Sequence, residues 1–260
     1  MKKTIQPRQQ QSKTAQTQTK IAVDGELVFG MHSVVELLKA GRRKLLSIYT
    51  TKPVPKGWDK IEKLLPKYPV NIQYVGRDVL HRIAQTTDHQ GIVSWARPFP
   101  FRRKPFDPKR YPLIVLIDGV QDPRNLGAII RSAYCTNTDG IVICKKGGAS
   151  LSAAALKASA GLAEHCEIYE AASAQAAADE LINAGYPLYL TTFDGSNAFT
   201  ATYTLPFCLV IGGEGLGISK SLLSRGTRIT LPQRTPDISY NASVAAGIVL
   251  FLAAQKLGRL

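Results

Sequence analysis

The second half of the chain contains six short, nearly uninterrupted apolar runs that are separated by helical patterns. Strands of a parallel sheet are covered on both faces and are therefore apolar along their whole length, whereas half-exposed strands alternate with polar residues. The pattern predicts an α/β domain with a doubly wound parallel sheet. Strands are expected at 113–117, 140–144, 166–169, 188–191, 207–211 and 229–231, and helices near 126–135, 153–160, 174–184 and 242–257.

Upstream of this domain, residues 25–96 alternate shorter strands and helices over about seventy residues. This predicts a second, small α/β unit. Its strands are expected at 28–29, 45–49, 71–75 and 92–96, and its helices at 33–40, 58–65 and 77–84.

Residues 97–112 join the two units and hold five prolines, with six basic residues against one acid. Proline removes a backbone donor and fixes φ, so this composition predicts an extended linker. Two interpretations of its Phe, Arg and Tyr side chains stay open. They stack along a nucleic acid, or they pack on the neighbouring domains.

The chain is strongly basic, with 33 Lys and Arg against 19 Asp and Glu and a net charge of +14. Such a protein is attracted to polyanions, and nucleic acid is favoured over membrane because no amphipathic basic helix is evident. A merely basic surface is the alternative. Residues 1–24 are rich in Lys and Gln and are expected to be a disordered tail. No signal peptide or membrane span is expected, so we predict a cytoplasmic protein.

The four cysteines lie singly in apolar segments without C-x-x-C spacing, and we expect them to be small buried residues. No histidine has a partner at metal-ligand spacing, so no metal site is predicted. The chain also lacks the glycine patterns of dinucleotide and P-loop sites and the serine elbow of hydrolases. These absences argue against several common enzyme classes.

Three polar or glycine-rich segments stand at 125–132, 211–217 and 241–247. The first opens the helix after strand 113–117, the second follows strand 207–211, and the third opens the last helix. Each has a simple structural explanation, since Asn caps helices and glycine permits tight turns. Their order, spacing and position at strand ends give the set its meaning, because ligands of such sheets bind beyond the carboxyl ends of the strands.

Together these segments resemble the SpoU (TrmH-like) branch of the SPOUT methyltransferases, which transfer a methyl group from S-adenosylmethionine to a ribose 2′-hydroxyl of RNA. Segments 28–38 and 89–93 are similar to the start and end of the small domain that precedes the catalytic domain in the large-subunit rRNA guanosine 2′-O-methyltransferases. The resemblance implies a ribosomal-protein L30e-like substrate-binding domain at 25–96. It also implies a trefoil-knotted SPOUT domain at 113–260 and a homodimer.

The resemblance also implies the site residues, and the chemistry indicates their tasks. The enzyme must align the hydroxyl with an already activated methyl group and stabilise charge on the oxygen. Arg131 stays protonated, which favours holding a phosphate and stabilising the alkoxide over acting as a base. The alternative is an Arg paired with a carboxylate. The implied catalytic residues are Arg131, Asn125, Glu214 and Asn241, with Asn125 as a helix N-cap. The implied cofactor residues are Gly212, Gly213, Thr192, Leu231, Tyr240 and Ser243.

Two departures from the family pattern concern the cofactor pocket. Tyr240 stands where an aliphatic residue is expected, and the loop 233–237 is more charged than usual. The function expected is methylation of a guanosine in large-subunit rRNA. The alternatives are a tRNA ribose methyltransferase and a catalytically silent RNA-binding factor of ribosome assembly. The last helix is apolar nearly all round, which also favours a dimer.

Overall fold

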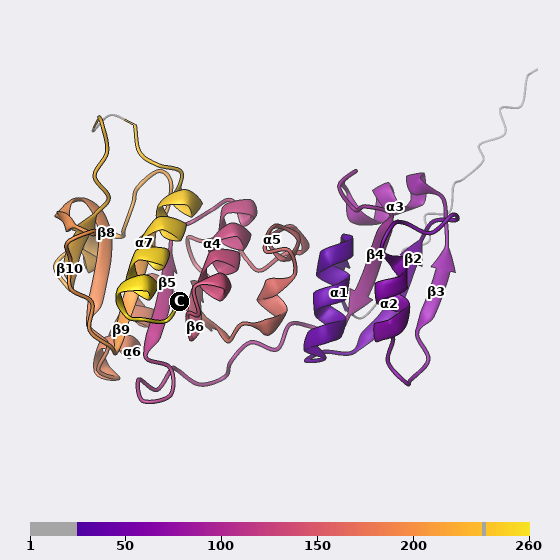
Figure 1. Cartoon of the computed structure of the whole chain (residues 1–260), viewed down its shortest axis with the longest axis horizontal. Coiled ribbons are helices and arrows are strands. Elements are labelled where there is room, and N and C mark those ends of the chain that lie inside the picture. Colours follow the sequence, from indigo (N-terminus) through magenta and orange to yellow (C-terminus); the bar gives the residue numbers. More distant parts are fainter. Residues whose placement is uncertain (1–24, 236–237) are drawn as a thin grey trace, which may run out of the picture.

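The computed structural model describes residues 25–235 and 238–260, which form two β-sheets side by side along the long axis of the molecule (Figure 1). The predicted disordered tail at 1–24 lies outside the described residues, as do positions 236 and 237 of the charged loop. No described helix is long and apolar enough to cross a membrane.

The smaller sheet has four strands in the order β1-β4-β2-β3, in which only β2 and β3 run parallel. Its predicted strands and helices are confirmed, with each boundary within two residues of the expected one. Its elements are β1 (Glu26–Phe29), α1 (Met31–Ala40), β2 (Leu45–Thr50), α2 (Trp58–Leu64), β3 (Asn71–Tyr74), α3 (Arg77–Ala84) and β4 (Ile92–Ala96).

The larger sheet has six parallel strands in the order β10-β8-β9-β5-β6-β7, which confirms the predicted parallel α/β architecture. Its strands are β5 (Leu113–Asp118), β6 (Gly140–Cys144), β7 (Ile168–Ala171), β8 (Leu188–Asn197), β9 (Phe207–Gly212) and β10 (Thr227–Thr230). Its helices are α4 (Pro123–Cys135), α5 (Ala153–Ala158), η1 (Leu162–His165), α6 (Ala174–Asn183), η2 (Lys220–Leu222) and α7 (Ala242–Lys256).

Three strand predictions in the larger sheet were wrong at their ends. β10 begins at Thr227, two residues before its expected start at residue 229. β7 begins at Ile168 and not at residue 166, because the short helix η1 (Leu162–His165) directly precedes Cys166. β8 continues to Asn197, six residues past its expected end, along a polar segment that pairs with β10. The apolar pattern missed this extension because the extra residues are partly exposed.

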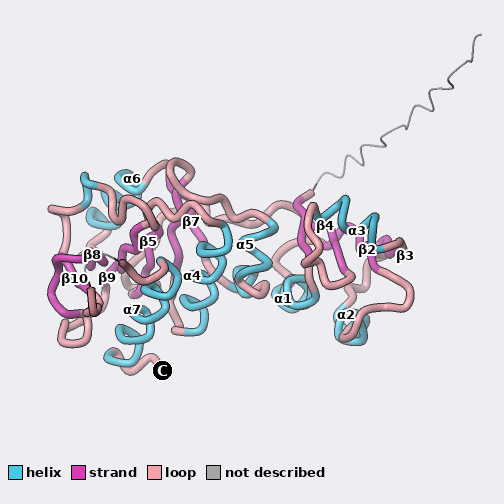
Figure 2. The backbone as a smooth tube through the Cα atoms, turned by 90° about the horizontal axis from the view of Figure 1, so that it is seen from above, coloured by secondary structure: helices cyan, strands magenta, loops and turns pink. Residues whose placement is uncertain are grey.

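Helices cover both faces of the larger sheet (Figure 2). Leu113, Val115 and Ile117 of β5 pack into a core shared with α4, α5 and α7, whereas Ile114 and Leu116 pack into a core shared with α6. Successive strand residues point to opposite faces, so a strand covered on both sides must be apolar throughout. This is the physical reason for the continuous apolar runs.

Residues 97–112 cross between the sheets without a helix or a strand. Phe99 and Phe106 are buried, and the Arg102 guanidinium lies 4.6 Å from the Phe106 ring centroid and 4.5 Å from that of Tyr111. The interpretation that the linker aromatics pack on the domains is therefore correct for these residues. Buried rings are not free to stack on RNA, so the other interpretation is wrong for them.

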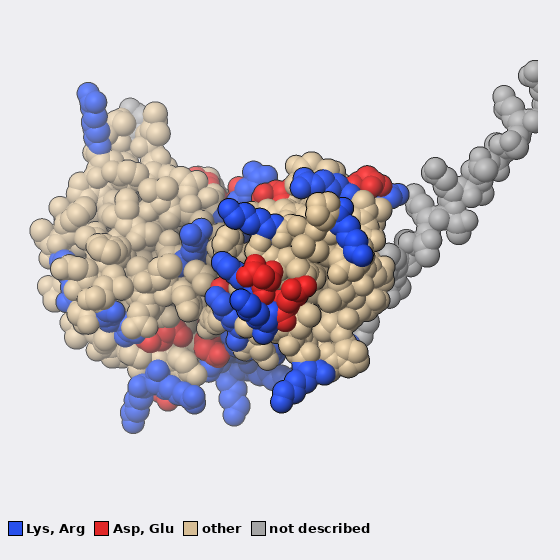
Figure 3. All heavy atoms as spheres, turned by 45° about the vertical axis from the view of Figure 1, so that its right-hand side comes forward, with Lys and Arg blue, Asp and Glu red and all other residues tan. Residues whose placement is uncertain are grey.

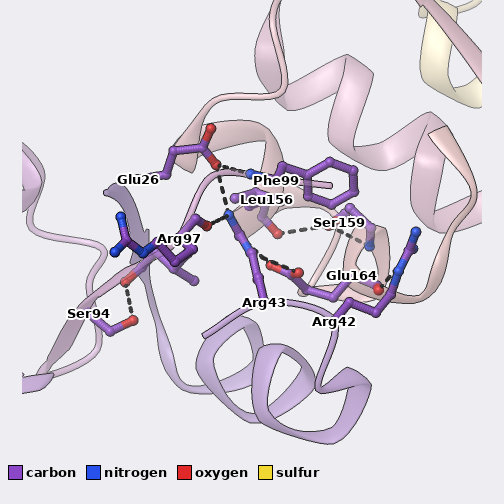
Figure 4. A network of polar contacts seen from close by, with 11 residues as sticks. Glu26, Arg42, Arg43, Ser94, Arg97, Phe99, Leu156, Ser159 and Glu164 are labelled. Atoms are coloured by element: carbon purple, nitrogen blue, oxygen red, sulfur yellow. Dashed lines mark hydrogen bonds and ion pairs between the residues drawn. The ribbon is translucent and has the colours of Figure 1, made fainter. Parts of the chain in front are cut away.

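A buried ion pair fastens the smaller sheet to the larger one (Figure 4). The Arg43 Nε donates to Glu164 Oε2 at 3.1 Å, and the two side chains are only 2% and 1% exposed. Arg43 also pairs with Glu26 at 2.8 Å, while Arg42 donates to the Cys166 carbonyl. Burial raises the pKa of Glu164, and Arg43 opposes that rise.

Cys144, Cys166 and Cys208 are buried, as predicted, but Cys135 is exposed at the end of α4, so the prediction was wrong for that residue. Burial raises the pKa of the Cys144 and Cys166 thiols to about 12, which keeps both un-ionised at neutral pH. The described residues contain no group of three or more His, Cys, Asp or Glu side chains that could hold a metal ion.

Candidate active site

A pocket of about 650 Å³ opens at the carboxyl edge of the larger sheet. Its walls come from the ends of β8, β9 and β10, the turn after β9, and the start of α7. A pocket of this size falls within the range of about 300–1,000 Å³ that small-molecule sites occupy. Seven of the ten predicted site residues line it: Gly212, Gly213, Thr192, Leu231, Tyr240, Glu214 and Asn241.

The glycines after β9 are required by backbone packing. A Cβ atom at Gly212 would lie 2.5 Å from the carbonyl carbon of Gly217, and one at Gly213 would collide with the Gly119 carbonyl oxygen. The Gly213 and Gly217 backbones also exchange two hydrogen bonds, of 3.2 and 3.1 Å. These two glycines let strand ends and turns approach one another, which agrees with the structural explanation that glycine permits tight turns, and both also line the pocket.

Asp118, the last residue of β5, holds the far end of this turn. Its carboxylate accepts two hydrogen bonds from Ser219, one from the backbone N at 2.7 Å and one from Oγ at 2.8 Å. Asp118 is only 4% exposed, so both bonds form away from bulk water. The turn 213–219 is thus fixed at its start by Gly119 and at its end by Asp118.

Asn125 and Glu214 meet across this edge. The Asn125 Nδ2 donates to Glu214 Oε1 at 2.6 Å, and the Gln121 backbone N donates to Glu214 Oε2 at 3.4 Å. The expectation that Asn125 caps the helix is wrong. α4 begins two residues earlier, and Asp122 is its N-cap, accepting from the Arg124 backbone N at 2.8 Å. Since the capping task falls to Asp122, the Asn125 amide is free to bind Glu214.

Asn241 is the N-cap of α7, and its Oδ1 accepts from the Ser243 backbone N at 2.9 Å and the Val244 backbone N at 3.4 Å. The Ser243 hydroxyl donates to the same oxygen at 2.6 Å. Asn241 lines the pocket but Ser243 does not. Ser243 therefore reaches the pocket only through Asn241.

Arg131 is exposed on α4, further along the helix than Asn125, and does not line the pocket. No carboxylate among residues 25–235 and 238–260 pairs with it. The alternative interpretation, an Arg held by a nearby acid, is therefore not what the structure has. An exposed guanidinium without an acid partner is available to an anion.

Sequence reasoning missed part of the pocket wall. Phe193 and Asp194 lie on the unpredicted extension of β8, and Arg228 of β10 pairs with Asp194 at 2.5 Å. The nearby Thr192 hydroxyl and the Arg228 guanidinium hold the pKa of the Asp194 carboxyl below its usual value. An acid on β8 facing a base on β10 becomes evident only when the strand pairing is known.

The pocket chemistry fits S-adenosylmethionine. Ile211, Ile218 and Val249 are among the lining residues and give an apolar surface for an adenine ring. Glu214 supplies a carboxylate that no Lys or Arg of the described chain neutralises, which suits a ligand carrying ammonium and sulfonium charges. Tyr240, the departure from the family pattern, is 44% exposed at the pocket wall.

Comparison with known proteins gives two family matches. Residues 112–251 match the SpoU rRNA Methylase family, and residues 27–101 match a family described as RNA 2′-O ribose methyltransferase substrate binding. An uncharacterized tRNA/rRNA methyltransferase of Mycolicibacterium gilvum is 32% identical, over 92% of this chain and 79% of that protein. A 23S rRNA (guanosine-2′-O-)-methyltransferase, RlmB of Photobacterium profundum, is 28% identical, over 90% of this chain and 99% of that protein.

A crystal structure of an AdoMet-bound rRNA methyltransferase from Sinorhizobium meliloti superimposes with a TM-score of 0.74 at 24% identity, over 90% of this chain and 88% of that one. That likeness shows the fold. The first family match spans more than half of the chain and includes the three segments that carried the resemblance, which is thereby confirmed. The chain belongs to the SpoU rRNA methylase family and is an RNA 2′-O-methyltransferase.

Proposed function

We propose that this protein uses S-adenosylmethionine to methylate the ribose 2′-hydroxyl of a guanosine in large-subunit rRNA. The observation that carries the proposal is one edge of the larger sheet, where the pocket lies and where Asn125 at the start of α4 is bonded to Glu214; the unpaired Arg131 lies further along the same helix. The relatives named as 23S rRNA guanosine methyltransferases, which align over most of this chain, support the choice of substrate.

In the pocket, the backbone at Gly212 and Gly213 and the side chains of Thr192, Leu231 and Tyr240 would hold the cofactor. Asn241, positioned by Ser243, would complete the wall. The bound cofactor supplies a methyl group already activated on sulfonium, so the chain's own residues need chiefly to align the acceptor oxygen.

Arg131 would bind the phosphate next to the target ribose and stabilise the charge that develops on its 2′-oxygen. A guanidinium stays protonated at any physiological pH, and its donors match phosphate geometry. Asn125 and Glu214 would fix the two segments between which the ribose enters, since their hydrogen bond joins α4 to the turn after β9. Such preorganised positioning is a large source of rate enhancement.

The net charge supports a division of labour between the two parts of the chain. Residues 113–260 hold eleven Lys and Arg against eleven Asp and Glu, so the whole excess of +14 belongs to residues 1–112. Figure 3 shows the molecule with the smaller sheet turned forward, and Lys and Arg side chains cover more of this face than Asp and Glu side chains do. We propose that residues 25–96, with the exposed cations of 97–112, select the RNA, while residues 113–260 carry out the transfer.

A homodimer through α7 belongs to the same proposal. Val244 and Phe251 are 49% and 56% exposed on this helix, although its other side packs against α4 and β9. Apolar side chains left uncovered on one face of a buried helix are typical of a subunit contact. The trefoil knot, the L30e-like architecture of the smaller sheet and a cytoplasmic location are further proposals that rest on the family resemblance.

A methylation assay with purified RNA tests the substrate. The protein is incubated with labelled S-adenosylmethionine and either unmodified large-subunit rRNA or unmodified tRNA, and the nucleosides are then separated. We expect 2′-O-methylguanosine from the rRNA only. Methylated tRNA would favour the tRNA alternative. Cofactor binding without transfer to either RNA would favour the silent assembly factor.

A further inference from the structure

Cations without a carboxylate partner recur at the carboxyl edge of the larger sheet. The segments that leave β10, β9, β5 and β6 each carry one exposed Lys or Arg for which the described part of the chain offers no ion pair or side-chain hydrogen bond. These four residues, called here the cation row, are Arg234, Lys220, Arg124 and Lys146.

Most other cations of residues 113–260 are neutralised. Arg225, Arg228 and Arg259 pair with acids at 2.6, 2.5 and 2.6 Å, and Lys145 pairs with Glu170 at 3.5 Å. Since this part of the chain has as many acids as bases, unpaired cations are not forced on it by composition. Their recurrence in one row is a feature of the edge itself.

The acids of the same edge are already bound by donors. Asp118 accepts from Ser219, Asp122 caps α4, and Glu214 accepts from Asn125. These carboxylates make their hydrogen bonds with neutral groups, and no acid among the described residues forms an ion pair with a member of the cation row. A row of unneutralised cations favours a polyanion, which can contact several of them at once.

The four cations follow strands at different positions in the sheet, so the cation row extends along its edge. From β10 through β8, β9 and β5 to β6 there are four strand spacings, which amount to roughly 20 Å. The pocket lies along this stretch, because it is built from the ends of β8, β9 and β10, and the helix that carries Asn125 and Arg131 begins at the same edge, after β5. A strand of RNA following the row would therefore pass the catalytic residues.

Beyond β6 the structure continues toward the smaller sheet. The Ala149 backbone N donates to the Val120 carbonyl at 2.8 Å, which joins the loop after β6 to the loop after β5. α5 follows and lies between α4 and α1 (Figures 1 and 2). The Lys157 ammonium of α5 lies 4.0 Å from Asp88. It also lies next to Gly30, since a Cβ atom added at Gly30 would come within 2.8 Å of Lys157 Nζ.

Segments 28–38 and 89–93, which carried the resemblance of the smaller domain, contact each other next to Lys157. The Gly30 backbone N donates to the Ile92 carbonyl at 3.2 Å, and the Met31 backbone N donates to Gln90 Oε1 at 3.0 Å. Gly30 has φ of +89°, which only glycine adopts readily, and Lys157 fills the space that a side chain would need. This corner thus connects the catalytic edge to the substrate-binding part.

We propose that the RNA backbone lies along the cation row and continues toward the corner at Gly30 and Gln90. The inference rests on the proposed function and deepens it by naming the path of the RNA from the target ribose to the substrate-binding part. Phosphate contacts of this kind position the RNA and carry no base specificity.

Alanine variants test the path through the salt dependence of RNA binding. Three variants each remove one exposed cation: Lys146→Ala, Lys220→Ala and Arg234→Ala. Lys146→Arg keeps the positive charge at position 146. The full-length protein is titrated with an rRNA fragment that contains its target nucleotide, at several salt concentrations. S-adenosylmethionine affinity is measured by calorimetry, and the transfer rate is measured at saturating RNA. Lys256→Ala is the matched control, since Lys256 lies at the opposite end of α7 from the pocket.

We expect each alanine variant to bind RNA several-fold more weakly and to lower the slope of log affinity against log salt by about 0.7–0.9. Cofactor affinity and the rate at saturating RNA should stay at the wild-type level, Lys146→Arg should retain the slope, and Lys256→Ala should match the wild type. If the wild type methylates the fragment but the alanine variants keep wild-type RNA affinity and salt slope, the proposed RNA path is wrong and the proposed function stands. A wild-type protein that neither binds nor methylates RNA would overturn the proposed function with it.

Discussion

Asn125 donates a 2.6 Å hydrogen bond to Glu214, although the two residues are 89 positions apart in the chain. This bond joins the first turn of α4 to the turn after β9, and Asp118 anchors the other end of that turn through Ser219. The chain's own side chains therefore hold these two segments of the candidate site in place. Preorganisation of this kind lowers the cost of arranging groups during the reaction.

Removing the amide of Asn125 should loosen this edge. We expect Asn125→Ala to lower the transfer rate by roughly 10- to 100-fold, because a misplaced positioning group costs about this much. Asn125→Asp should lower it further, since it sets two carboxylates against each other. Single-turnover rates with saturating cofactor and RNA measure both effects. Equal rates for wild type and both variants would show that the bond has no part in catalysis.

Arg131→Ala should abolish most of the transfer and leave cofactor affinity unchanged. Loss of one charge stabiliser costs about 10²–10³ in rate, and Arg131 does not line the pocket. Calorimetry with S-adenosylmethionine, beside a methylation assay, separates the two effects. Undiminished turnover would remove Arg131 from the mechanism. A loss of cofactor affinity equal to the loss of rate would place Arg131 at the cofactor instead.

Asp118→Ala should weaken the cofactor pocket because it releases the turn 213–219. The change leaves the partly buried Ser219 backbone N without its acceptor, which typically costs about 1–3 kcal/mol where the donor is shielded from water. We expect a lower melting temperature and a raised KM for S-adenosylmethionine, with a smaller change in kcat. Ser219→Ala keeps the backbone bond and should show a weaker form of the same defect. An unchanged KM in a destabilised Asp118→Ala protein would limit Asp118 to folding.

The buried pair Arg43–Glu164 predicts a large loss of stability on truncation. Glu164→Ala leaves the Arg43 guanidinium buried without its partner, and breaking a buried ion pair in this way costs about 3–5 kcal/mol. Replacing both residues with apolar ones, as in Arg43→Met with Glu164→Leu, should recover much of that loss. Urea denaturation measures the free energies of unfolding. A Glu164→Ala protein as stable as the wild type would show that the pair does not hold the two sheets together.

The exposed side of α7 predicts the oligomeric state. Phe251→Asp places a charge in the proposed subunit contact and should convert a dimer into a monomer, whereas Phe251→Leu should stay dimeric. Light scattering at micromolar concentrations distinguishes the two states. A monomeric wild type, or a dimer that survives Phe251→Asp, would contradict a contact through this face.

The elements of the fold could be predicted well because most are defined by local patterns. The all-apolar run 140–144 matches β6 at both ends, and the amphipathic stretch 77–84 matches α3. β8 was predicted too short because Asp194 to Asn197 are polar, and their strand conformation depends on β10, more than thirty residues later. Periodicity contains no information about such pairing.

The residues of the candidate site could be named from the sequence, but most of the contacts between them could not be predicted. Family resemblance named Asn125 and Glu214 but assigned Asn125 to a helix cap, because the true start of α4 depends on Asp122. Asp118 and Ser219 were missed altogether, since they are 101 residues apart and ordinary in type. A tight turn was the expected structural reason for Gly213, but its contact with the Gly119 backbone could not be predicted, because Gly119 follows another strand.

The most direct test of this account is a map of 2′-O-methylated nucleotides in total RNA from cells with and without the gene. The account predicts that one guanosine of large-subunit rRNA loses its methyl group without the gene. Wild-type protein should restore it and Arg131→Ala protein should not. If every ribose methylation of the large-subunit rRNA persists without the gene, the central claim is contradicted.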